Sequence, residues 1–352
     1  MKCICVTILV LSLIFLGSCA DRGNAVTSKL LARFPEMQTK EKLQAASSDQ
    51  LELLPILRST GKTSVTAFVL PTSIGYSSAG DLFISDNNGQ TIHRWAVNTD
   101  RPTVFLANNA IGLLEFPNGI QSVGGQVFVA DNAGIKVFSA EGQLERLIRT
   151  YFTVFSFVVT PRNTIFINPI IRNAGAQDPL IIELDNQGRR IRGFGLRRNT
   201  NNNMFDDRAF LTLGQGKLFV GFKYSRTVEV YDVDSGRLID SINIDHEVLN
   251  QLPHLNVRSA TSGAEEKLAQ LRYIAGVKSV QDKLFVCLHL PQPEILEFDQ
   301  NGRAVAHFRV PVRTPAIDIF GFEARDTGKH KRMAIGIVEP DWSSNIYEVA
   351  AP

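Results

Sequence analysis

Short runs of apolar and β-branched residues, separated by polar turns, repeat along most of the chain. One run occurs in six copies, at residues 81–86, 126–131, 163–168, 217–221, 283–287 and 331–336. A second run follows each copy, at residues 91–95, 134–138, 180–184, 228–231, 294–298 and 345–349. The apolar residues lack helical spacing, and β-branched and aromatic residues dominate, so these runs predict β-strands.

Each pair of runs belongs to a larger unit of four strands. A further strand-like stretch precedes each pair, at residues 72–78, 118–123, 154–160, 208–213, 274–280 and 317–323. In four copies a turn at Gly142, Gly188, Gly236 or Gly302 leads into another strand, because glycine supplies the positive φ of a tight hairpin. The pattern predicts an all-β fold, a six-bladed β-propeller of four-stranded blades. A solenoid is the alternative, but its repeats are usually shorter and more regular.

The two ends of the repeat region complement each other. The sixth unit lacks an outer strand, whereas residues 63–70 form a strand-like stretch with no blade of its own. Placing this stretch as the fourth strand of the last blade removes an exposed edge. We therefore predict a monomeric propeller over residues 59–352, with its last blade closed by an N-terminal strand.

The N-terminus has the pattern of an exported protein. A positive start is followed by an apolar run at residues 4–16, which is short for a bilayer span and suits a signal peptide. The Leu-Gly-Ser-Cys segment ending at Cys19 resembles the lipobox of bacterial lipoproteins. That resemblance implies a signal peptide at 1–18, acylation of Cys19 by chains such as palmitate, and a tether at 19–58. Ala20 favours the outer over the inner membrane. An ordinary secretory signal or a buried helix is the alternative.

Composition narrows the classes of partner. The net charge is +2 and like charges do not form long blocks, which argues against nucleic acid as a ligand. The one basic cluster, at residues 189–192 and 197–198, is interpreted as a solvated face. Cys3 and Cys5 leave with the signal and Cys19 is acylated, so only Cys287 remains, and we expect it to be a small buried hydrophobe.

The second unit carries a resemblance to a known family. Residues 116–120, 127–131, 135–138 and Gly142 resemble the NHL-repeat pattern, and the whole chain from about residue 63 resembles NHL-repeat and TolB-like six-bladed propellers. The resemblance implies the fold but not one function, since such propellers serve as scaffolds, binders, lactonases and lyases. Asp86 and Asp131 end their strands in the NHL manner and are expected to cap turns.

Loop lengths separate the two faces of the predicted ring. Loops from the first to the second strand of each blade are mostly short. Those on the opposite face are long, at residues 107–117, 168–179, 196–207, 245–272, 288–293 and 339–344. Long loops in a compact domain are usually functional or disordered, so we place the site on this long-loop face. Residues 261–272 fit a small helix over the channel, with a surface excursion of no function as the alternative.

Candidate chemistry is sparse. No protease, hydrolase, phosphate-loop or paired-cysteine motif occurs, and His246, His254 and His289 show no metal-ligand spacing on the long-loop side. Resemblance to six-bladed lactonases of the gluconolactonase kind implies a divalent cation at the channel mouth, with oxygen ligands that suit Ca²⁺. Asn118, Asn168 and Glu339 are the candidates, although hydrogen bonds to nearby backbone explain such asparagines more simply. No other cofactor is indicated.

These observations favour binding over catalysis. We expect an envelope-anchored propeller that binds or scaffolds a peptide, protein or glycan through its long-loop face. Arg172, Tyr224, Arg226 and Trp342 are the expected contacts, because tyrosine, tryptophan and arginine contribute much of the energy of interfaces; Trp342 packing on its own blade is the alternative for that residue. A cation-dependent hydrolase or lyase with its site at the channel mouth is the alternative function, and a purely structural envelope protein is the third.

Overall fold

The computed structural model describes residues 52–58, 68–97, 99, 102–107, 114–132, 134–171, 174–175, 177–198, 206–246, 249, 272–290, 292–310, 312, 316, 318–328, 331–339 and 344–351. The predicted signal peptide, Cys19, most of the tether and residues 261–271 lie outside this part of the chain. Within the described residues, no helix has the length and apolar character needed to cross a bilayer.

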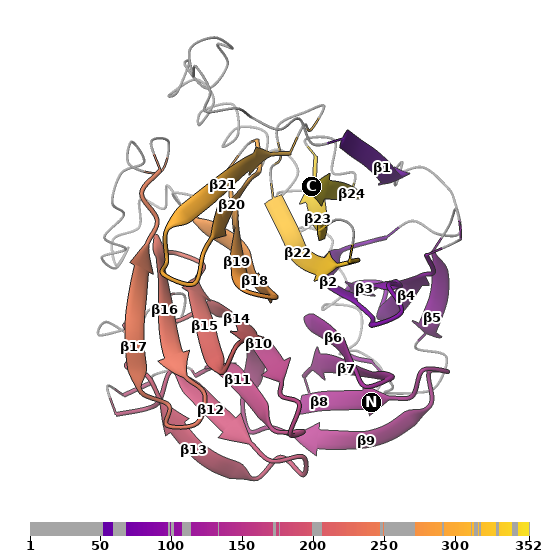
Figure 1. Ribbon diagram of the computed structural model, residues 1–352. Coiled ribbons are helices and arrows are strands. Elements are labelled where there is room, and N and C mark those ends of the chain that lie inside the picture. Colours follow the sequence, from indigo (N-terminus) through magenta and orange to yellow (C-terminus); the bar gives the residue numbers. More distant parts are fainter. Residues whose placement is uncertain are drawn as a thin grey trace, which may run out of the picture. The chain divides into compact units, whose positions relative to one another are not determined.

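The described strands form six antiparallel sheets of four strands each, which confirms the predicted propeller (Figure 1). The first three blades are β2 (Pro71–Tyr76), β3 (Leu82–Asp86), β4 (Thr91–Trp95) and β5 (Thr103–Ala107); β6 (Gly119–Val123), β7 (Gln126–Asp131), β8 (Gly134–Phe138) and β9 (Leu144–Arg149); and β10 (Thr153–Val159), β11 (Ile165–Ile170), β12 (Ile181–Leu184) and β13 (Arg190–Phe194). The next two are β14 (Ala209–Gly214), β15 (Lys217–Phe222), β16 (Thr227–Asp232) and β17 (Leu238–Asn243); and β18 (Ile274–Val280), β19 (Lys283–Leu288), β20 (Glu294–Phe298) and β21 (Ala304–Arg309). Blade six is β22 (Asp318–Asp326), β23 (Lys331–Val338), β24 (Ser344–Ala351) and β1 (Glu52–Arg58).

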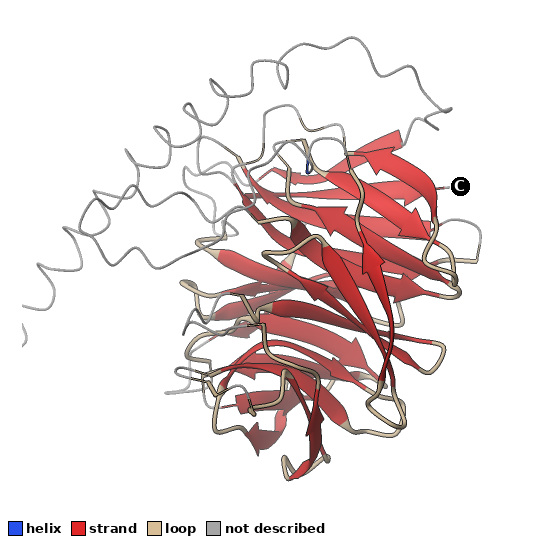
Figure 2. Ribbon diagram, turned by 90° about the vertical axis from the view of Figure 1, so that its left-hand side faces the viewer, coloured by secondary structure: helices blue, strands red, loops and turns tan. Residues whose placement is uncertain are grey.

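The blades pack into a closed ring. The first strand of each blade contacts the first strand of the next, and β22 returns to β2. These six strands surround the axis in Figure 1, and Figure 2 shows loops gathered on two opposite sides of the ring.

The core lies between neighbouring blades. Strands β3, β8, β12 and β20 are buried along their whole length, because another blade covers each face of their sheets. Phe166 of blade three shares an apolar cluster with Phe222 of blade four, and Ile84 of blade one shares another with Ile346 of blade six. Burying such a side chain contributes about 1.5–3 kcal/mol. Cys287 has no exposed surface and burial raises its pKa, as expected for a buried hydrophobe.

The strand that closes the ring differs from the predicted one. Strand β1 pairs antiparallel with β24, from Glu52 opposite Ala350 to Arg58 opposite Asn345. An N-terminal strand therefore completes the last blade, but the prediction that residues 63–70 supply it is wrong. Pro55 in β1 lacks an N–H donor, and proline is tolerated on an edge strand or at a bulge. Both conditions hold here, because β1 is an outer strand and its register shifts between Pro55 and Leu57.

Buried carboxylates hold the chain where it enters the inner strands. The carboxylate of Asp86 accepts hydrogen bonds from the N–H groups of Val69 (2.7 Å) and Leu70 (2.8 Å), just before β2. Asp131 does the same for Glu115 and Phe116 before β6. The interpretation of Asp86 and Asp131 as capping residues is confirmed, and both fix loops on the long-loop face.

Polar side chains also join neighbouring blades near the axis. Gln121 accepts a hydrogen bond from the N–H of Val159 (2.8 Å), Ser156 from that of Leu211 (3.0 Å), and Thr212 from that of Ser279 (3.0 Å). Blades two to five are thus linked in sequence.

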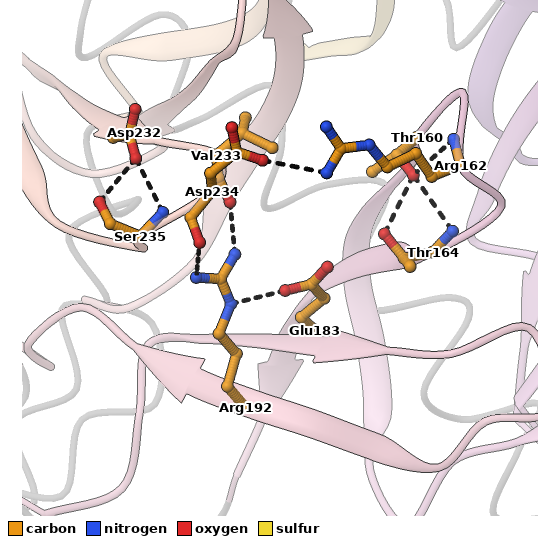
Figure 3. A network of polar contacts seen from close by, with 9 residues as sticks. All are labelled: Thr160, Arg162, Thr164, Glu183, Arg192, Asp232, Val233, Asp234 and Ser235. Carbon is orange, nitrogen blue, oxygen red and sulfur yellow. Dashed lines mark hydrogen bonds and ion pairs between the residues drawn. The ribbon is translucent and has the colours of Figure 1, made fainter.

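The opposite, short-loop face is tied together where blades three and four meet (Figure 3). Arg192 on β13 donates to Glu183 (2.6 Å) and to the carbonyl oxygens of Val233 and Asp234. Arg162 adds an ion pair with Asp234 at 3.1 Å. Arg162 and Arg192 thus both bind the turn at residues 233–234 of blade four and join it to blade three.

The basic cluster is less solvated than predicted. The side chain of Arg197 is 1% exposed and pairs with Asp207 at 3.1 Å. Arg198 lies over the ring of Phe222, with 3.5 Å between its Cζ and the ring centroid, and pairs with Glu229. The prediction of a solvated face is therefore wrong for residues 197–198, because acidic and aromatic partners come from the loop before β14 and from blade four.

Candidate functional site

A cavity of about 300 Å³ occupies the channel at the centre of the ring. The first strands of all six blades line it, so its wall is built from the most central part of each repeat. Phe155, Phe157, Phe210 and Phe320 supply much of the apolar surface. Its lining combines these apolar rings with polar and charged groups, and a concavity of this kind can bind a small molecule.

Charged side chains gather at the mouth of this cavity on the long-loop face. Lys223 follows β15, Arg272 precedes β18 and Asp318 begins β22, and all three line the cavity. In an antiparallel blade, the start of the first strand and the end of the second lie at the same edge. Main-chain hydrogen bonds join the residues at this edge. Lys223 N donates to the carbonyl oxygen of Arg208 (2.9 Å), and Tyr273 N donates to the carbonyl oxygen of Lys223 (2.8 Å).

Asp318 is held as a carboxylate. It forms an ion pair with Arg272, lies 3.0 Å from Nε2 of His289, and accepts a hydrogen bond from its neighbour Ile319 N at 2.8 Å. Burial alone would raise the pKa of Asp318, but His289 and Arg272 outweigh burial and hold that pKa well below its usual range. Asp318 therefore stays ionised and orients both partners.

Lys223 is the member of this cluster whose pKa shifts towards neutral pH. Burial, which is the largest cause, and the charges of Arg272 and Arg208 lower its pKa, Asp318 opposes them, and the net pKa is about 8. Its Nζ lies 5.7 Å from the centroid of the Phe155 ring, and Cζ of Arg208 lies 5.6 Å from the same ring. An amine with this pKa is partly neutral near pH 7 to 8, whereas the amine of an ordinary lysine is almost fully protonated there.

On the opposite side of the mouth, the described lining residues of blades one and two are uncharged. Thr72 donates a hydrogen bond to the carbonyl oxygen of Pro117 (2.7 Å), and the amide oxygen of Asn118 accepts one from Asn87 (3.3 Å). Blades four to six thus present cations and a paired carboxylate, and blades one and two present a hydroxyl and an amide. This asymmetry suits a ligand that has one anionic end.

The predicted metal ligands have separate roles. Asn118 lines the cavity, whereas Asn168 and Glu339 are not among its lining residues. The Asn168 amide donates to the carbonyl oxygens of Leu180 (3.2 Å) and Asp207 (3.0 Å) and accepts from Ala209 N (3.0 Å). Glu339 is buried and accepts a hydrogen bond from the hydroxyl of Tyr347 at 2.6 Å.

Among the described residues, Asn118, Asn168 and Glu339 do not converge on one point at the channel mouth, so a Ca²⁺ ion held by these three stays a prediction. Ca²⁺ takes about six to eight oxygen ligands, but the Asn168 amide already donates to two main-chain carbonyl oxygens and accepts from Ala209 N. The carboxylate that does line the mouth, Asp318, is already paired with Arg272 and His289. Lys223 beside it would repel a cation.

Two of the four predicted binding residues lie beside this cluster. Tyr224 follows Lys223, and its side chain hydrogen-bonds to Arg208 and Arg272. Arg226 lies near Tyr273, where its charge opposes the increase in pKa that burial causes. Arg172 and Trp342 lie outside the described residues.

Sequence reasoning missed Lys223, Arg272 and Asp318. They belong to no motif and lie far apart in the sequence. One signal was present: Lys223 and Arg272 lie two residues from predicted strands (217–221 and 274–280), and Asp318 lies at the start of another (317–323), each at the end that faces the long loops. Charged residues at those positions of a propeller repeat are candidates for the channel mouth.

Comparisons with known proteins agree with the architecture. No protein-family model and no curated protein sequence matches the chain. Among solved structures, a gluconolactonase from Xanthomonas campestris is 14% identical, with 89% of this chain and 94% of that chain covered and a TM-score of 0.55. A calcium-binding regucalcin from Agrobacterium tumefaciens is 10% identical, with 88% and 98% covered and a TM-score of 0.56. A candidate exported protein from Bacteroides fragilis is 12% identical, with 89% and 98% covered and a TM-score of 0.60.

At such identities the likeness shows the fold alone. The chain is a six-bladed β-propeller whose structural neighbours include a gluconolactonase and a regucalcin. The resemblance to NHL-repeat and TolB-like propellers stays a prediction.

Proposed function

We propose that the channel mouth is the active site of a hydrolase or lyase that acts on a small ester, lactone or carboxylate. The observation that carries this proposal is Lys223, an amine with a pKa of about 8 that lines the cavity together with Arg272. The gluconolactonase among the structural neighbours supports the same chemical class.

The neutral amine of Lys223 acts as the general base. In ester hydrolysis it takes a proton from water as the water oxygen bonds to the carbonyl carbon. The ester C–O bond then breaks, and the Lys223 ammonium returns the proton to the leaving oxygen. In a lyase the same amine takes a proton from the carbon next to a carboxylate, the electron pair of that C–H bond forms a C=C bond, and the leaving group on the adjacent carbon departs with its bonding electrons and accepts the proton from the Lys223 ammonium. General bases of this kind accelerate reactions by about 10²–10⁴-fold.

Arg272, which lines the cavity, stabilises the negative charge that develops on the substrate oxygen, whereas Arg208 acts through its effect on the pKa of Lys223. Fixed cations at a partly dry site need no reorganisation when the charge forms. Asp318 keeps Arg272 in place, and the phenylalanines of the channel exclude water from one side.

The experiment measures turnover of a panel of small lactones, esters and hydroxy acids. Lys223→Met should reduce turnover at least about 100-fold, in line with the contribution of a general base. The matched control is Lys217→Met, since Lys217 begins the strand that Lys223 follows and lies at its other end. It should retain full turnover.

The binding function inferred from the sequence uses the same face. The cations at the mouth would then hold an acidic group of a peptide or glycan without chemistry. Saturable binding of carboxylates that depends on Lys223, with no turnover by the unchanged protein, would support that alternative and overturn the enzymatic proposal.

A further inference from the structure

Two histidines and a glutamate meet away from the channel, at the outer edge where blades four and five adjoin. His246 follows β17, the outer strand of blade four. Glu294 begins β20 and His307 lies in β21, the outer strand of blade five. One ligand atom from each of the three residues lies within 4.8 Å of the other two.

Both imidazole rings point at the same carboxylate oxygen. Nε2 of His246 lies 2.7 Å from Oε2 of Glu294, and Nε2 of His307 lies 2.6 Å from that atom. The two rings are perpendicular, with 5.5 Å between their centroids. Two nitrogens and one oxygen therefore converge on one point from two blades.

The strand register explains this meeting within blade five. Glu294 pairs with Arg309, and Leu296 pairs with His307. Residues two apart on a strand share a face, so Glu294, His307 and Arg309 project to the same side of the sheet. Arg309 donates from Nε to the other carboxylate oxygen, Oε1, at 3.2 Å. That contact fixes the carboxylate and leaves Oε2 directed at the histidines.

We propose that His246, Glu294 and His307 bind a divalent transition-metal ion such as Zn²⁺, which links the outer edges of blades four and five. Two imidazoles and one carboxylate are a common zinc donor set, whereas Ca²⁺ and Mg²⁺ prefer oxygen ligands alone. Arg309 is the outer partner that orients the carboxylate. The ion would enter from the His307 side, whose side chain is 42% exposed, while those of His246 and Glu294 are 12% and 7% exposed.

Zinc binding is measured by titration of the metal-free protein with Zn²⁺ and by the visible absorption of bound Co²⁺. The full chain should bind one Zn²⁺ at this site, with a tetrahedral Co²⁺ spectrum and a rise in Tm on addition of the metal. His307→Ala and Glu294→Gln should each weaken Zn²⁺ binding at least 100-fold and abolish the rise in Tm. Arg309→Ala should weaken it about 10–100-fold, as the loss of an outer partner does.

His289→Ala is the matched control, because His289 also pairs with a carboxylate, Asp318, outside the cluster. It should leave Zn²⁺ affinity and the Co²⁺ spectrum unchanged. If the unchanged protein binds no stoichiometric Zn²⁺, or if His307→Ala binds it as tightly, the cluster is an ion-pair network only and the proposal is wrong. Lys223→Met should not alter Zn²⁺ binding, so this test stands apart from the proposed activity.

Discussion

The amine of Lys223 and the carboxylate of Asp318 face one cavity but differ in what decides their protonation. At Lys223, burial and the neighbouring guanidinium groups act in the same direction. At Asp318, His289 and Arg272 overcome burial. Near neutral pH the carboxylate keeps its charge, and Lys223 is the cluster member whose pKa falls to about 8.

The dependence of turnover on pH should therefore follow Lys223. Because the neutral amine is the active form, kcat/KM should rise through about pH 8 and level off above it. Arg208→Gln removes a positive neighbour, so the amine should hold its proton more tightly and the inflection should move to higher pH. A pH–rate profile of both proteins measures this. A profile without an inflection between pH 7 and 9, or one that Arg208→Gln leaves in place, contradicts the role of Lys223.

Asn168 should matter for stability and not for metal binding. Its amide satisfies three main-chain groups, from Leu180, Asp207 and Ala209. Asn168→Ala should lower the free energy of unfolding by about 3 kcal/mol, since each unsatisfied buried polar group costs about 1–3 kcal/mol. Urea denaturation measures it, with Asn118→Ala as the control that should lose less than about 1 kcal/mol. Equal losses, or a loss that added Ca²⁺ modulates, would contradict this assignment.

At the scale of strands, the six repeats could be predicted because their central strands are apolar on both faces. Nearly every copy of this strand, such as residues 217–221 and 283–287, is a short apolar run. Closure of the last blade by an N-terminal strand could also be predicted, but the position of that strand could not, since β1 contains Pro55 and its partner β24 lies far away in the sequence. The two charged clusters could not be predicted either, because their members are far apart in the sequence. Lys223 and Asp318, or His246 and Glu294, become neighbours only when the packing of the blades is known.

Removal of β1 should weaken the last blade. A chain that begins at residue 59 lacks β1 and leaves β24 with an unpaired edge. Its Tm should fall by about 5–10 °C relative to a chain that begins at residue 49, equivalent to a few kcal/mol in a domain of this size. Differential scanning calorimetry compares them. Equal melting temperatures would show that β1 contributes nothing to closure.

At the scale of the whole molecule, acylation of Cys19 and attachment to a bacterial envelope stay predictions from the sequence. Cys19→Ala should move the protein from the membrane fraction to the soluble fraction, because the acyl chains supply the membrane affinity. Cell fractionation and mass spectrometry of the N-terminus test this. Unchanged partitioning, or an intact signal peptide on the unaltered protein, would rule out the lipoprotein assignment.

The pairing of β1 with β24 also sets an order of events during synthesis. Strand β1 leaves the ribosome before the other strands of the propeller, and its partner β24 leaves it after blades one to five. Five blades can therefore form while β1 has no partner strand. Contacts between distant parts of a chain also form slowly. A chain released early by the ribosome could stack its first blades, yet its ring would stay open with two unpaired sheet faces. Quality-control proteases would then act on this open form.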